Sequence, residues 1–117
     1  MEKVVFKYPE VSPALLGQIT DVIVKETKPQ FLVLFGSHAR GEANRQSDLD
    51  FLVVLDSQFD VTKRFEIMNR LDHLLTPFRI PCDIIVRTRD EFDYWKTSLN
   101  NVVGRASREG KVLYERP

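Results

Sequence analysis

The chain has 117 residues, and its 17 lysines and arginines balance its 17 aspartates and glutamates, so the formal net charge is zero. This length supports one hydrophobic core, and we expect a single domain over residues 1–117. A balanced charge gives no general attraction to long nucleic acids, so bulk nucleic-acid binding is not expected. The one cysteine, Cys82, excludes an internal disulfide and a cysteine-cluster metal site. We expect a cytoplasmic protein, because the charged N-terminus does not suit a signal peptide and no apolar run could cross a membrane.

The first half of the chain predicts a helix followed by two strands. Ser12-Pro13 is a typical helix start, and Lys28-Pro29 ends the same helix. An apolar strand is predicted over residues 31–35, followed by a short helix that ends near Gly41. The second predicted strand covers residues 49–55.

The second half of the chain also alternates helix and strand. Four further elements are predicted: a helix over 61–75, a strand over 80–87, a helix over 88–108 and a short strand over 111–114. Thr88 and Glu91 form a capping box at the start of the last helix, and any break in that helix is expected near Gly104. The order of elements indicates an α/β (α+β) fold with a small mixed sheet flanked by helices.

Gly36 and Ser37 form a turn between the first strand and the short helix. Glycine lets the backbone turn tightly and approach a ligand closely, and a serine at a helix start can cap the helix. The N–H groups at such a start favour anions, so the turn suits a phosphate group. Arg40 could reach a triphosphate from the short helix, although an exposed helix arginine is an equally good interpretation.

Asp48 and Asp50 lie at the start of the second strand. Because side chains alternate along a strand, both carboxylates should point to one face, with Leu49 and Phe51 on the other. Adjacent carboxylates repel each other unless a cation offsets their charge. A phosphate-binding turn beside two carboxylates suits a metal–nucleotide complex, since Mg²⁺ bridges protein carboxylates and substrate phosphates. A solvated strand start is the alternative.

These features together resemble the signature of a known superfamily. The string Gly36-Ser37-His38-Ala39-Arg40-Gly41, followed by Ser47-Asp48-Leu49-Asp50-Phe51, resembles the nucleotidyltransferases that include DNA polymerase beta. It is most similar to their small stand-alone branch, the minimal nucleotidyltransferases. The order of predicted elements extends this resemblance across most of the chain.

The resemblance implies a polymerase beta-like fold and a transfer of a nucleoside monophosphate to a hydroxyl group. It implies that Gly36 and Ser37 bind the β and γ phosphates, and that Asp48 and Asp50 bind two Mg²⁺ ions. Asp83 matches the third carboxylate, which would bind the catalytic metal and help to deprotonate the acceptor. From the residue alone, Asp83 could instead be an edge-strand charge or the partner of an arginine.

The resemblance also implies the substrates and a protein partner. The donor would be ATP or another nucleoside triphosphate, and the partner a HEPN-family toxin that receives AMP on a tyrosine hydroxyl. Two alternatives stay open: an antitoxin that acts by contact alone, and a transferase for a small-molecule hydroxyl. The sequence does not decide the base, the acceptor or the oligomeric state, a homo-oligomer included.

Two further groups of residues have open interpretations at this stage. Phe92, Tyr94 and Trp95 are candidates either for a partner-binding surface or for the core. His38 lies inside the motif at a spacer position and is interpreted as a tolerated surface residue.

Overall fold

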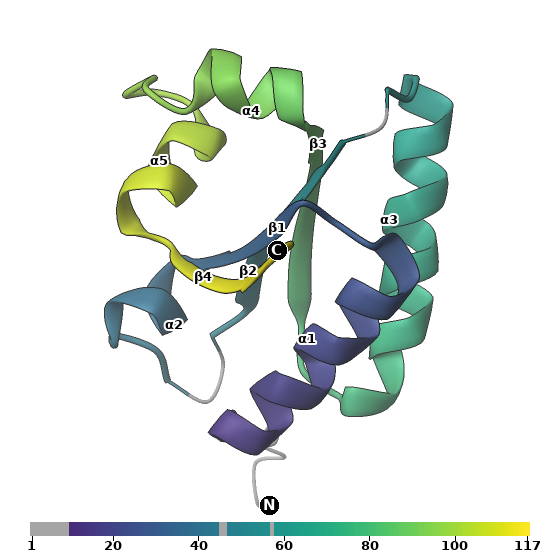
Figure 1. Ribbon diagram of the computed structural model, residues 1–117. Coiled ribbons are helices and arrows are strands. Elements are labelled where there is room, and N and C mark those ends of the chain that lie inside the picture. Colours follow the sequence, from purple (N-terminus) through teal and green to yellow (C-terminus); the bar gives the residue numbers. More distant parts are fainter. Residues whose placement is uncertain (1–9, 45–46, 57) are drawn as a thin grey trace, which may run out of the picture.

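The computed structural model describes residues 10–44, 47–56 and 58–117. The charged N-terminal residues and two residues of the loop inside the motif lie outside this part. Six helical segments and four strands follow one another in the order α1 (Pro13–Thr27), β1 (Phe31–Phe35), α2 (Ser37–Arg40), β2 (Leu49–Leu55), α3 (Val61–Leu75), η1 (Thr76–Phe78), β3 (Cys82–Thr88), α4 (Arg89–Trp95), α5 (Val102–Glu109) and β4 (Lys111–Glu115) in the described residues (Figure 1).

The four strands form one mixed sheet in the order β3-β2-β1-β4. β1 pairs antiparallel with β2 and with β4, whereas β2 pairs parallel with β3. A parallel pair needs a long crossover connection, and α3 with η1 provides it between β2 and β3. The parallel pair therefore lies at one edge of the sheet, where β3 has a neighbour on one side.

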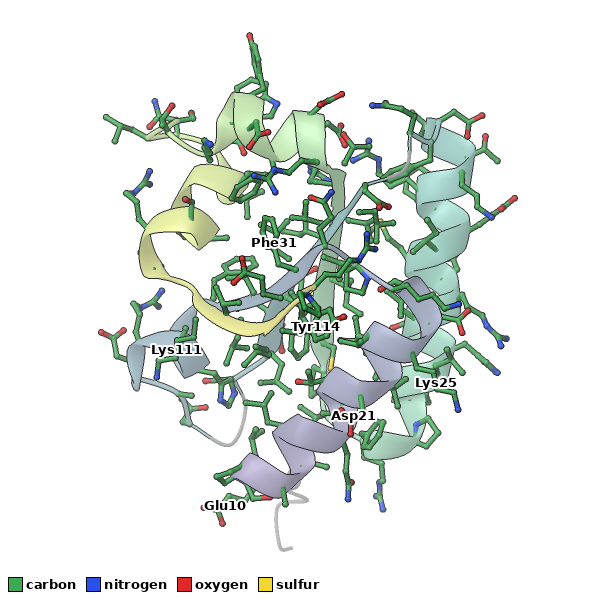
Figure 2. The ribbon with its side chains drawn as sticks, viewed as in Figure 1. Glu10, Asp21, Lys25, Phe31, Lys111 and Tyr114 are labelled. Carbon is green, nitrogen blue, oxygen red and sulfur yellow. The ribbon has the colours of Figure 1, made fainter. Side chains whose placement is uncertain are left out.

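Helices cover both faces of the sheet (Figure 1). α1 and α3 pack on one face over a core that includes Ile19, Leu71 and Phe51, and α5 packs on the other over Leu52 and Val54. In Figure 2, the side chain of Phe31 lies on the side of α4 and α5, and that of Tyr114 lies toward α1. The observed architecture is the expected mixed α/β sheet with flanking helices.

Local capping interactions explain the helix boundaries. The Ser12 side chain accepts a hydrogen bond from the backbone N–H of Leu15 at 3.1 Å, and Pro13 occupies the first turn of α1, as the sequence predicts. An interaction of the same type begins α3, where the Asp60 side chain accepts a hydrogen bond from the backbone N–H of Lys63 at 2.8 Å. The capping box of Thr88 and Glu91 at α4 is confirmed.

The prediction of one helix over 88–108, broken if anywhere near Gly104, is wrong. The chain forms two helices, α4 and α5, separated by residues 96–101. Asn101 begins the second helix by accepting a hydrogen bond from the backbone N–H two residues on, at 2.8 Å. Gly104 lies inside α5, where an added Cβ would clash with the Ser98 carbonyl group, so glycine lets the connecting segment pack against the helix.

Other boundaries differ from the predictions by small amounts. The third strand is Cys82–Thr88 instead of 80–87, and Ile80 lies buried ahead of the strand. The last strand extends one residue further than predicted, to Glu115. Within the described part of the chain, no helix is both long and apolar enough to span a membrane.

Candidate active site

Asp50 and Asp83 lie opposite each other on neighbouring strands. β2 and β3 pair in parallel with Asp50 in register with Asp83, and Leu49 in register with Cys82. Leu49 and Phe51 are fully buried in the core beneath α1 and α3. The alternation of side chains therefore directs Asp50 to the opposite face, as the sequence predicts.

Burial and neighbouring charge both act on the carboxyl group of Asp50. It is half-buried, whereas Asp48 and Asp83 are exposed. Burial, followed by the negative charges of Asp83 and Asp48, raises the pKa of Asp50, and the charges of His38 and Arg40 lower it in part. The three aspartates thus form an acidic site in which each negative charge opposes the others.

Gly36 lies directly against the Asp50 carboxylate. Its φ of +77° is a conformation that favours glycine, and an added Cβ would clash with a carboxylate oxygen of Asp50. Glycine therefore lets the turn after β1 approach the acidic site more closely than a residue with a side chain would allow. Ser37 is half-buried and begins α2, so the start of this helix follows directly on the turn that contacts Asp50.

His38 has a structural role that the sequence interpretation missed. Its Nε2 lies 3.2 Å from the backbone carbonyl oxygen of Ser47, to which it donates in the tautomer with the proton on Nε2. This contact ties α2 to the residue that precedes Asp48. The loop between the two positions has no periodic pattern, so no sequence signal could have identified the contact.

Arg40 is held by two carboxylates. Its guanidinium group donates to Glu42 at 3.0 Å and to Glu109 at 3.1 Å. Glu109 comes from the end of α5, far away in the sequence, and this partner could not be predicted. A phosphate group would have to compete with both glutamates for Arg40.

Cys82 is not a nucleophile in this environment. Burial, followed by the charges of Asp48 and Asp72, raises the pKa of its thiol to about 11, so the thiol stays protonated at neutral pH. Its Sγ lies 3.4 Å from the Ile80 carbonyl oxygen, to which the thiol donates.

The donor set of the site fits a metal that arrives with its substrate. No three His, Cys, Asp or Glu side chains among the described residues are gathered tightly enough to hold a metal ion by themselves. Mg²⁺ usually takes one or two carboxylates, several waters and substrate phosphates instead of a complete protein shell. Asp48, Asp50 and Asp83 offer such hard oxygen ligands, and the turn at Gly36 lies directly against one of them, Asp50.

Of the late aromatic residues, one belongs to the core and two are exposed. Phe92 is half-buried and packs edge-to-face against Phe31, with ring centroids 4.8 Å apart, at the edge of the core. Tyr94 and Trp95 contact each other in the same geometry, and their exposed fractions are 72% and 40%. Leu99, in the segment that follows α4, is 80% exposed.

Comparison with known proteins shows the family to which this chain belongs. The family described as polymerase beta, nucleotidyltransferase, matches residues 17–117. Two proteins of Methanocaldococcus jannaschii, both provisionally named protein adenylyltransferases, are 31% identical to the chain. The first match covers 71% of this chain and 76% of the relative, and the second covers 73% and 84%.

Solved structures with the same fold include a protein described as a nucleotidyltransferase and toxin–antitoxin complexes. One from Sulfolobus solfataricus has a TM-score of 0.59 at 22% identity, over 88% of this chain and 79% of that one. A toxin–antitoxin complex with AMP-PNP has a TM-score of 0.57 at 20% identity, over 86% and 73%. The tri-AMPylated HEPN toxin of Shewanella oneidensis in complex with its MNT antitoxin has a TM-score of 0.53 at 18% identity, over 88% and 72%.

Proposed function

Because this chain belongs to the polymerase beta family of nucleotidyltransferases, we propose that it transfers AMP from ATP to a hydroxyl group on a protein partner. The observation that carries the proposal is the contact between Gly36 and Asp50, with Asp83 in register beside them. The turn at Gly36, which would bind phosphates, lies next to the Asp50 and Asp83 carboxylates at the same end of the parallel strand pair. The relatives named protein adenylyltransferases support AMP as the transferred group and a protein as the acceptor.

Each residue of the site has a proposed role in this reaction. Gly36 and Ser37 bind the β and γ phosphates of the nucleotide through the turn and the start of α2. Asp48, Asp50 and Asp83 would hold Mg²⁺, two ions in the usual arrangement, which would neutralise the charge on the phosphates. Arg40, whose charge acts on Asp50, can add positive charge toward the phosphates once it leaves Glu42 and Glu109.

The chemical step is an in-line substitution at the α phosphorus. The acceptor hydroxyl oxygen forms a bond to phosphorus, the bond to the bridging oxygen of the β phosphate breaks, and pyrophosphate leaves. The Asp83 carboxylate takes up the hydroxyl proton, since it is the exposed member of the paired aspartates. Catalysis then depends mainly on positioning and charge neutralisation.

The proposed acceptor is a tyrosine hydroxyl on a HEPN-family toxin, which would make this chain the antitoxin of a pair. The likeness to an MNT antitoxin in complex with an AMPylated HEPN toxin supports this assignment. Tyr94 and Trp95 are exposed and in contact, and Leu99 is exposed in the segment that follows; such side chains could anchor a partner, since aromatic residues are enriched in interface hot spots.

Incubation with the product of the adjacent gene tests the proposal. The protein, ATP, Mg²⁺ and that product are combined, and intact-mass spectrometry records the mass of each chain. We expect mass steps of one AMP on the partner, and none when ATP is replaced by a non-hydrolysable analogue. A partner that is bound and silenced but unmodified would contradict transfer and support inhibition by contact alone.

A further inference from the structure

His38 connects the turn proposed to bind phosphates with the backbone that leads into Asp48. It is the second residue of α2, directly after Ser37, and its side chain is half-buried. Its Nε2 lies 3.2 Å from the backbone carbonyl oxygen of Ser47, nine residues further along the chain. The contact therefore joins the two segments that meet at the proposed active site.

Ser47 belongs to a tight turn with Asn44. The backbone N–H of Ser47 donates to the Asn44 carbonyl oxygen at 3.1 Å, and the backbone N–H of Asn44 donates to the Ser47 Oγ at 2.9 Å. These two bonds close the turn on itself. The bond from His38 attaches the turn to α2, and through α2 to the end of β1.

Asp48 lies between two residues that are held from different directions. After it, the backbone N–H of Leu49 donates to the Pro81 carbonyl oxygen at 2.9 Å, and the Leu49 side chain is fully buried. Before it, Ser47 is held by His38. Asp48 itself is exposed, so packing does not fix its carboxylate. The backbone on either side therefore determines where this carboxylate lies.

Resting on the transfer proposed above, we propose that His38 is a positioning residue for Asp48. The ring holds Ser47, and Asp48 then enters β2 with its carboxylate on the same side of the strand as that of Asp50, where a metal can bridge both to the nucleotide phosphates. A residue that orients a metal ligand in this way typically changes metal affinity roughly 10- to 100-fold when it is replaced. His38 touches neither the metal nor the nucleotide in this role.

Three substitutions at His38 separate the hydrogen bond from the volume of the ring. His38→Gln keeps an N–H donor, His38→Phe keeps a ring without a donor, and His38→Ala removes both. Calorimetric titration measures the affinity of each variant for the Mg²⁺ complex of a non-hydrolysable ATP analogue. We expect the alanine and phenylalanine variants to bind about tenfold more weakly than the original chain, and the glutamine variant to stay within about threefold of it.

His73→Ala is the matched control, because it removes the other histidine of the chain from an exposed position on α3. This variant should bind the analogue like the original chain. Thermal unfolding should give similar Tm values for His38→Gln and His38→Phe, so that their difference in affinity does not come from a loss of fold. If His38→Ala does not fold, the comparison of these two variants still decides.

NMR spectra of the isotope-labelled chain without nucleotide test the contact directly. The ring nitrogen shifts of His38 should show the proton on Nε2, the tautomer that donation to Ser47 requires. Nitrogen relaxation should show greater mobility of the Ser47 and Asp48 backbone in His38→Phe than in the original chain. The mobility of Gly36 should not change, and His38→Gln should behave like the original chain.

These readouts distinguish failure of this inference from failure of the proposed transfer. Weaker binding in His38→Phe, with no AMP transfer by the original chain, would keep the role of His38 and overturn the transfer. Unchanged binding in His38→Phe, an equal loss in His38→Gln, or a ring protonated on Nδ1 alone would overturn the role of His38, whatever the transfer assay shows. An original chain that does not bind the Mg²⁺ complex of the analogue would overturn both.

Discussion

Asp50 and Asp83 stand opposite each other because β2 and β3 pair in parallel at these two residues. A shift of one residue in this register would turn one carboxylate into the core beneath α3. The buried alternate residues of both strands, such as Phe51 and Ile84, oppose that shift. The packing of the core therefore fixes the spacing of the acidic pair.

Asp50→Asn should stabilise the fold at neutral pH. The pKa of Asp50 is raised by burial and then by Asp83 and Asp48, so the folded chain favours the protonated form. The stability that protonation gives is present at acid pH and is lost as the pH rises through the folded pKa. Asparagine mimics the neutral form, so thermal unfolding should show a higher Tm than the original chain at neutral pH and a smaller difference in acid. A lower Tm at neutral pH would contradict this account.

Asp48→Asn and Asp83→Asn should both abolish transfer but differ in nucleotide binding. Each loss removes charge neutralisation worth on the order of several kcal/mol in the transition state. If Asp83 serves the acceptor more than the nucleotide, the Asp83 variant should keep most of its affinity for a Mg²⁺ complex of a non-hydrolysable ATP analogue, and the Asp48 variant should lose it. Calorimetric titration measures both. Equal loss in the two variants would assign Asp83 to the nucleotide site.

Gly36→Ala should be destabilising and should also prevent nucleotide binding. A non-glycine residue at this φ costs about 1–2 kcal/mol, and the Asp50 carboxylate must move as well. Gly41→Ala is the matched control, because Gly41 has a φ of +74° but open space around it. Gly36 has a ψ of −158°, a region that is essentially restricted to glycine, whereas Gly41 with a ψ of 19° is in the left-handed helical region, so Gly36→Ala should lose more stability than Gly41→Ala in denaturant unfolding. Nucleotide titration should show a loss of binding in Gly36→Ala alone.

Glu109→Gln should tighten nucleotide binding if Arg40 contacts the triphosphate. The neutral side chain weakens the ion pair that holds Arg40 at 3.1 Å, so the guanidinium group moves more easily to a phosphate. We expect an affinity a few times higher at low salt, with the gain lost in the Arg40→Gln background. An effect of Glu109→Gln that persists without Arg40 would exclude this explanation.

Glu91→Ala should lower stability by about 1–2 kcal/mol, more than Glu91→Gln, because it removes the capping box as well as the contact with Arg64. Burial raises the pKa of Glu91, but the hydrogen bonds from Arg64 and Thr88 outweigh it and leave the pKa lowered. The stability that ionised Glu91 contributes is therefore present above the pKa that Glu91 has in the unfolded chain, and it is lost as the pH falls through the pKa of Glu91 in the folded chain. Asp93→Asn, which affects an exposed ion pair, should change stability little.

The sequence predicts most of the fold because its signals are local. The strand over 31–35, the strand over 49–55 and the capping box at Thr88 depend on neighbouring residues, and each is confirmed. The split between α4 and α5 was missed because it depends on the close approach of Gly104 to the Ser98 carbonyl group. That contact exists only in the folded chain and leaves no local signal in the sequence.

The candidate site divides in the same way. The order of Gly36, Asp48 and Asp50 along the chain indicated a phosphate site next to carboxylates, and the register placed Asp83 beside them. The partners of His38 and Arg40 could not be predicted, because Ser47 lies across an irregular loop and Glu109 at the end of another helix. Such long-range polar contacts leave no periodic trace in a sequence.

The pairing of β1 with β4 has a consequence for the order of folding. It joins Phe31 to Glu115 and Leu34 to Lys111, which are far apart in the sequence, and the ladder is irregular between Leu32 and Val33. Closing so long a loop costs more entropy than pairing β1 with its neighbour β2. Contacts distant in sequence form late and open early, so β4 should exchange its amide hydrogens with water faster than the two inner strands. Every proposed catalytic aspartate lies outside β4, and the reacting centre can stay intact while this edge of the sheet opens.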